Sequence, residues 1–194
     1  MMRLTLLFAA LGLSGCIVFD KQSEAVTFHQ FAAAEATATR SAPLIHVPRA
    51  TLPAGVRRPA VVLLTPGGEV LIDDSHRWTA TLDRLVAETV ARHLTWEAGT
   101  PTVATTPDAP HFTLILECER FEVLAGRRAA LTIHYRLERA DGSAVAGGTS
   151  ACVEPMPDLG APAFVAAQSR NLAKVGRAIA ETVRALPASQ FPSR

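Results

Sequence analysis

The sequence predicts an α+β fold, a two-layer sandwich in which a largely antiparallel sheet packs against two amphipathic helices. Three observations predict it. Residues 76–95 and 163–186 repeat apolar side chains at intervals of three and four, which is the period of an α-helix. Between these helices, three segments alternate apolar and polar residues, as strands with one solvated face do. Turn-forming residues separate the three segments, so we expect an antiparallel meander.

The residues before the first helix predict short strands. One strand is expected at 44–47, and Pro48 ends it because its nitrogen has no hydrogen to donate to a ladder. Two apolar runs in 61–72 flank the Thr-Pro-Gly-Gly stretch at 65–68, and this turn chemistry predicts a hairpin. Residues 26–31 have the composition of a further short strand.

Both predicted helices have sequence signals at their ends. The helix over 76–95 follows Asp73 and Asp74, which we interpret as its N-terminal cap because anionic groups favour a helix start. Gly99 is its expected stop. The helix over 163–186 has a proline in its first turn, where the missing N–H costs nothing, and another proline directly after it.

Trp78 admits two interpretations. Trp is usually largely buried, so we expect Trp78 to pack the start of the first helix against the sheet. The alternative is a surface contact, because His76 and Arg77 precede it.

The meander segments are 112–119, 129–138 and 144–153, and two cysteines lie on its outer strands. Cys118 is in the first of these segments and Cys152 in the third. A strand between them would give a disulfide atypical geometry, so we expect two buried free thiols.

The N-terminus carries a signal for export. One basic residue, a short apolar run and a small-residue site that ends in Cys16 are typical of a secretory signal. The run is too short for a transmembrane helix, which needs about 20 residues. Its ending, Leu-Ser-Gly-Cys, resembles the lipobox of bacterial lipoproteins. That resemblance implies a diacylglyceryl group on the Cys16 sulfur, cleavage before Cys16 and acylation, typically palmitate, of the new N-terminus. The alternative is a plain signal peptide that is cleaved elsewhere.

These features divide the chain into four parts. We predict a lipoprotein signal peptide at 1–15, a lipidated N-terminus and tether at 16–42, an α+β domain at 43–187 and a C-terminal tail at 188–194. By resemblance to lipoproteins of two-membrane bacteria, Ile17 after the cysteine favours the outer membrane over the inner membrane.

Several function classes lack support in the sequence. The formal net charge is +1 and no basic run has interleaved aromatics, which argues against a nucleic-acid-binding protein. The mature chain has no nucleophile elbow, phosphate-binding loop or zinc-protease motif. The six histidines are dispersed, and we expect His93 and His134 to be surface or edge residues rather than metal ligands. Glu117 and Glu119 share a strand face, as solvated strand residues routinely do. We therefore predict no catalytic residue, no cofactor and no metal, and expect that the protein is not an enzyme.

The order of these features resembles the PqiC-like ABC-type transport auxiliary lipoproteins, over nearly the whole chain. The resemblance is carried by the lipobox, an aromatic strand soon after it and a Trp-containing run before the first helix. It continues in a long strand, the meander and an Ala-Ala-Gln-Ser start of the last helix. The segments that carry it are 13–16, 28–31, 47–48, 70–85, 120–122, 166–169 and 179–180. After Trp78 the chain reads Thr-Ala-Thr, where the family has an acidic residue and a proline.

The resemblance implies a non-catalytic accessory lipoprotein. Such proteins accompany MCE-domain subunits, which form lipid tunnels between the two membranes, and an ABC permease and ATPase. The resemblance implies docking of the MCE subunit at the periplasmic face of the outer membrane, phospholipid trafficking and membrane integrity. Two surfaces are candidates for this docking: the exposed face of the sheet and the loops at the start of the first helix. Exposed strand edges would also permit a homo-oligomer. Two alternatives remain open: a tethered periplasmic hydrolase, and a structural scaffold lipoprotein of another outer-membrane assembly or secretion complex.

Overall fold

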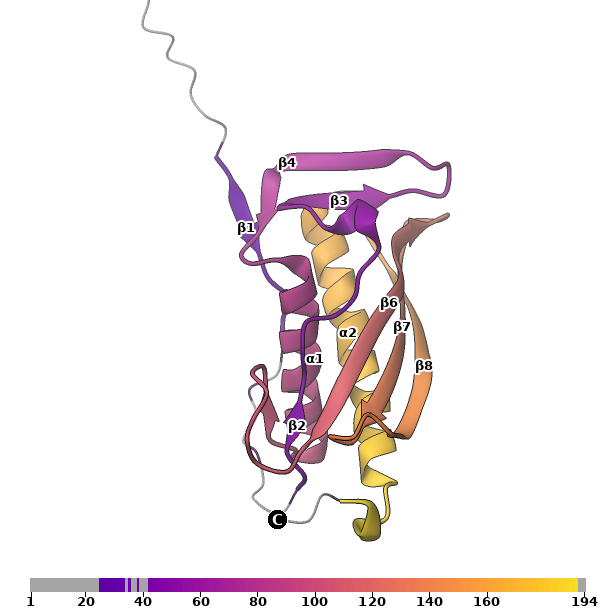
Figure 1. The fold of residues 1–194 in the computed structure, drawn as a ribbon. Helices are drawn as coiled ribbons and strands as arrows, with labels where there is room; N and C mark the ends of the chain where they lie inside the picture. Colours follow the sequence, from indigo (N-terminus) through magenta and orange to yellow (C-terminus); the bar gives the residue numbers. More distant parts are fainter. Residues whose placement is uncertain (1–24, 34, 36–37, 39–41, 192–194) are drawn as a thin grey trace, which may run out of the picture.

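The computed structural model describes residues 25–33, 35, 38 and 42–191, so the predicted signal peptide and Cys16 lie outside the described residues. Two long helices pack side by side, one sheet covers their flank, and a smaller sheet crosses the end at which both helices begin (Figure 1). The helices are α1 (Leu82–Ala98) and α2 (Ala161–Arg184). The predicted α+β class is confirmed.

The larger sheet has five strands in the order β5-β2-β6-β7-β8. Its antiparallel part is the predicted meander, which is confirmed, and its other edge carries two short parallel strands. Strands of this sheet are β5 (Thr102–Val103), β2 (Ile45–His46), β6 (Phe112–Leu124), β7 (Arg128–Glu138) and β8 (Ala144–Pro155). One face of the meander packs on α2.

The smaller sheet has the order β1-β4-β3, with β1 (Thr27–His29), β4 (Val70–Trp78) and β3 (Ala60–Leu64). Strands β3 and β4 form the predicted hairpin, with Gly68 at a φ of 78° in the turn, a conformation that favours glycine. Strand β1 joins this hairpin in parallel. The sequence indicated one largely antiparallel sheet; the structure instead has two, because the β3–β4 hairpin pairs with β1, whereas the meander pairs with β2 and through it with β5.

The predicted start of the first helix at residue 76 is wrong. Strand β4 continues through Trp78, and α1 begins at Leu82 after Thr81. Asp73 caps no helix; its carboxylate accepts hydrogen bonds from the backbone and hydroxyl of Ser75 within the strand. The predicted stop is confirmed, since Gly99 follows α1 at a φ of 64°. The pairing of residues 76–78 with β1 keeps this stretch extended, and that partner lies 49 residues away in sequence.

The packed body begins upstream of residue 43, where the sequence placed the end of a tether. Strand β1 pairs with β4, and Phe31 beyond it is only 1% exposed. The tail predicted at 188–194 also starts in contact with the body. Residues 188–190 form a short 3-10 helix, and the Phe191 ring lies 6.5 Å from the ring of Phe112. Both corrections have one reason: an aromatic side chain docks these ends on the core.

Candidate docking surfaces

An aromatic cluster joins the small sheet, the large sheet and α2. The Phe31 ring centroid lies 5.1 Å from that of Trp78 and 6.4 Å from that of Phe121, which in turn lies 5.3 Å from Phe164. Trp78 is 5% exposed, so its predicted burial is confirmed and the surface-contact interpretation is wrong. It lies at the end of β4, however, and not at the start of the first helix as predicted. The cluster positions β1, and with it the point at which the chain enters the body.

Polar side chains of α2 hold neighbouring segments in place, and the sequence analysis missed their role. Gln168 and Asn171 are fully buried and donate hydrogen bonds to the backbone carbonyls of Ala130 and Ala129 on β7. The Ser169 hydroxyl accepts a hydrogen bond from the backbone N–H of Ala32, just after β1. The available signal was the polar run inside an otherwise apolar helix face. These contacts are structural, because each fixes one element to another.

Two histidines join β1 to β4. His29 Nε2 and His76 Nδ1 lie 2.7 Å apart, within hydrogen-bond distance, and His76 Nε2 lies 3.8 Å from the carboxylate of Asp73. Burial lowers the pKa of His29 below its ordinary value of 6.5, and neighbouring His76 lowers that pKa further. A hydrogen bond between two imidazoles needs one unprotonated nitrogen, so the contact is lost when both rings are charged.

His93 is buried where α1 crosses α2, not at a surface or an edge as the sequence indicated. Burial lowers the pKa of His93 below its ordinary value of 6.5. His134 does lie on the exposed outer face of the meander, as predicted, where it contacts Glu119 and Thr149. Among residues 25–33, 35, 38 and 42–191, no cluster of three potential metal ligands occurs.

We expect the protein to lose stability as the pH falls below about 6.5, the ordinary histidine pKa. His29 and His93 both have lowered pKa values in the folded state, so the unfolded chain binds more protons in that range. Stability from these groups is therefore complete above the unfolded pKa and decreases toward the folded one. Thermal unfolding at pH 7.5 and 5.5 measures the effect, and His29→Gln should reduce the pH dependence. A melting temperature equal or higher at pH 5.5 would contradict it.

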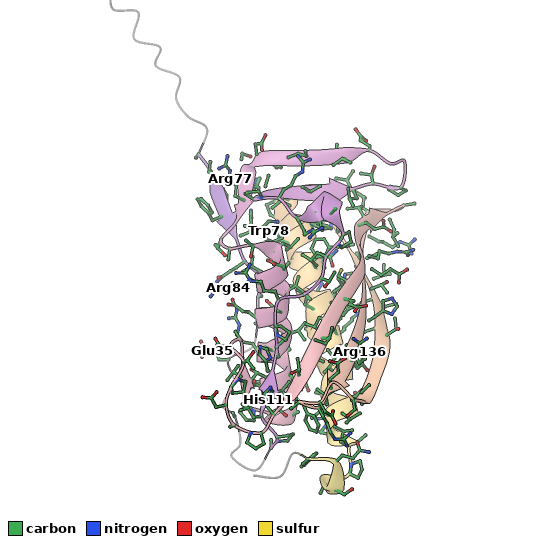
Figure 2. All side chains as sticks on the ribbon, in the orientation of Figure 1. Glu35, Arg77, Trp78, Arg84, His111 and Arg136 are labelled. Carbon is green, nitrogen blue, oxygen red and sulfur yellow. The ribbon has the colours of Figure 1, made fainter. Side chains whose placement is uncertain are left out.

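The outer face of the meander is one of two surfaces that the sequence suggested for docking. It is polar and charged, with a hydrogen bond of 2.9 Å between His134 Nε2 and the Glu119 carboxylate and with Arg136 exposed nearby on β7 (Figure 2). Cys118 and Cys152 are free and buried, as predicted, and burial raises the pKa of the Cys118 thiol to about 12. That thiol is therefore a poor nucleophile at neutral pH.

The second suggested surface is the loop region at the start of α1. A hollow of about 280 Å³ lies there, between the loop that precedes β3 and the first turn of the helix. Arg57 and Arg58 contribute exposed cations on one side, and Asp83 contributes a carboxylate on the other. Between these charges its lining is apolar, from residues that include Pro59, Trp78 and Ala80. Its volume is below the roughly 300–1,000 Å³ of typical ligand pockets, which favours a protein contact over a whole bound lipid.

The outer side of the small sheet carries exposed apolar side chains, in contrast to the charged outer face of the meander. Four side chains there are exposed: Val26 (40%), Phe28 (62%), Val70 (50%) and Ile72 (43%). We call these four residues the β1–β4 face. Sequence analysis did not single out this face because its members come from two segments separated by more than 40 residues.

The protein is thus an α+β body in which buried Gln168, Ser169 and Asn171 fix α2 to neighbouring segments. Its exposed surfaces suit contacts with other molecules. The family model for the "ABC-type transport auxiliary lipoprotein component" matches residues 27–180. The chain therefore belongs to this family of lipoproteins, which are components of ABC-type transport systems. No helix in the described part of the chain is long and apolar enough to span a membrane.

Solved structures share the fold at low sequence identity. An uncharacterised protein is similar with a TM-score of 0.68 and 16% identity, over 81% of this chain and 98% of that one. A Xanthomonas campestris protein of the DUF330 family is similar with a TM-score of 0.64 and 18% identity, over 80% of this chain and 93% of its own. A search of curated protein sequences found no match.

Proposed function

We propose that this protein is a non-catalytic lipoprotein, anchored through Cys16 at the periplasmic face of the outer membrane, that docks an MCE-domain subunit for phospholipid trafficking. The observation that carries the proposal is the family match over residues 27–180 together with the lipobox-like sequence before Cys16. Two or three acyl chains on one cysteine would hold the body firmly, because one chain alone binds only marginally.

The structure supports an accessory role for the body. Its ionisable clusters, His29–His76–Asp73 and Glu119–His134, are explained by contacts between strands. The charged outer face of the meander is the surface we assign to the MCE subunit, because charge gives such contacts specificity and speeds association. The ABC permease and ATPase would be contacted only indirectly, through that subunit.

Co-purification with an MCE-domain subunit from the same organism tests the proposal. We expect the tagged, lipidated chain to retain that subunit, and Arg136→Glu to weaken retention by reversing charge on the meander face. Arg58→Glu is the comparison variant, because Arg58 is also exposed but lies at the hollow beside α1, the other candidate docking surface. Loss of retention in Arg58→Glu but not in Arg136→Glu would contradict the assignment of docking to the meander face. Failure of the wild-type chain to co-purify, with normal outer-membrane permeability in a deletion strain, would sink the proposal. Retention of a β-barrel or secretin subunit instead would indicate a scaffold for a different assembly.

A further inference from the structure

We propose that the β1–β4 face rests on the membrane surface and inserts its apolar side chains among the lipid headgroups. This inference rests on the proposed lipid anchor at Cys16. It assigns the body an orientation: the small sheet lies nearest the membrane, and the opposite ends of α1 and α2 lie farthest from it.

Strand register shows that these side chains point away from the core. Phe28 is paired with Arg77 and both side chains are exposed, so this pair faces outward. Val70 and Ile72 alternate with Leu71, which packs against the core, so they also point away from it, whereas Val62 opposite Ile72 is covered. The neighbouring residues on the strands, including Val61, Leu63 and Trp78, belong to the hydrophobic core on the opposite face. The exposed apolar side chains therefore form an outward surface, which a protein body rarely presents without a partner.

The length of chain between Cys16 and the body limits the possible partners. Ala25 is the first described residue, and the nine residue steps from Cys16 can reach about 30 Å when fully extended. Helix α2 has 24 residues and is therefore about 36 Å long. Because the chain enters at β1, beside the end where α1 and α2 begin (Figure 1), the far end of the body cannot be turned against the anchoring membrane. The small sheet is thus the end of the body nearest the anchor, and β1 stays within about 30 Å of that membrane.

The size of the surface favours a membrane over a protein. A stable protein interface buries about 800 Å² on each partner, from about 20–30 residues a side, whereas the β1–β4 face offers four apolar side chains. A weak contact suffices at a membrane, because the anchor keeps the surface at a high effective concentration. Arg77 lies on the same face, beside Phe28, where its guanidinium can meet lipid phosphates (Figure 2). Glu69 and Asp74 are exposed nearby and offset the positive charge of Arg77. We therefore expect apolar contact, rather than net charge, to contribute most of the interaction with the membrane.

Depth-dependent fluorescence quenching tests this orientation in the full, lipidated protein. One variant carries Phe28→Cys and the matched control carries Trp96→Cys, since Phe28 and Trp96 are aromatic and are 62% and 60% exposed. Trp96 lies near the C-terminal end of α1, away from the small sheet. A maleimide fluorophore would label the new cysteine selectively, because Cys118 and Cys152 are buried and Cys16 is blocked by lipid. An Ile72→Cys variant keeps the test valid should the label at position 28 disturb β1.

The labelled proteins are reconstituted in phosphatidylethanolamine–phosphatidylglycerol vesicles that contain nitroxide-labelled lipid. We expect the labels at positions 28 and 72 to be quenched severalfold more than the label at position 96. Equal quenching at all three positions would overturn the inference. Aqueous iodide provides a second check on the label at position 28. If iodide quenches this label less as the number of protein molecules per vesicle rises, the surface contacts other copies of the chain, and the inference is overturned.

The two proposals fail in different ways. A protein that floats with the vesicles but shows no preferential quenching at position 28 refutes the orientation and leaves the anchored docking function intact. A protein that carries no lipid and does not float refutes the proposed anchor, and the orientation with it.

Discussion

Replacement of Phe31 by Ala is expected to lower the free energy of unfolding by about 3–5 kcal/mol, the usual cost of removing a buried aromatic side chain. The Phe31 ring is 1% exposed and contacts both Trp78 and Phe121, so its loss leaves a cavity between the two sheets. The variant should also loosen β1, because Phe31 follows that strand directly.

Phe28→Ala is the control for this prediction. The same chemical change three residues earlier removes a ring that is 62% exposed, so the free energy of unfolding should change little. Chemical denaturation followed by tryptophan fluorescence measures both variants, since Trp78 packs against Phe31. Equal losses in the two variants would show that β1 does not position Phe31 as the structure describes.

A Gly176→Val substitution is expected to destabilise the protein by about 3 kcal/mol, at the upper end of the range for overpacked cores. Gly176 lies in α2 where α1 crosses it, and any added Cβ would overlap the Cβ of His93 and lie 3.5 Å from its Cα. The neighbouring atoms belong to a helix backbone and to the base of a side chain, so they cannot move aside without separating the helices.

Ala178→Val is the matched control, because it introduces the same β-branched side chain into α2 at a half-buried position two residues from Gly176, about 200° around the helix. It should cost only the small helix propensity of valine. A double-mutant cycle adds a second check: Gly176→Ala should cost less when His93 is also replaced by Gly. Additive effects of these two substitutions on the melting temperature would contradict a direct overlap.

Local signals in the sequence were sufficient to predict most of the helices and strands. The hairpin of β3 and β4, the meander and the stop of α1 at Gly99 all follow from turn residues and apolar periodicity, which act within a few residues. The free state of both cysteines was also predicted correctly, because a strand separates the two strands that carry them. The start of α1 was wrong because Asp73 and Asp74 have the composition of a helix cap but lie in a strand.

The sequence by itself determined the α+β class, the two helices, the meander and the family to which the chain belongs. Only the tertiary structure decided that residues 27–31 belong to the body, that His93 is buried against Gly176, and that Phe28 and Ile72 are both exposed on the small sheet. The physical reason is the range of the interactions. Periodicity and turn chemistry act between neighbours in the chain, whereas parallel pairing and helix crossing join residues about 50 to 80 positions apart, whose contact no local pattern specifies.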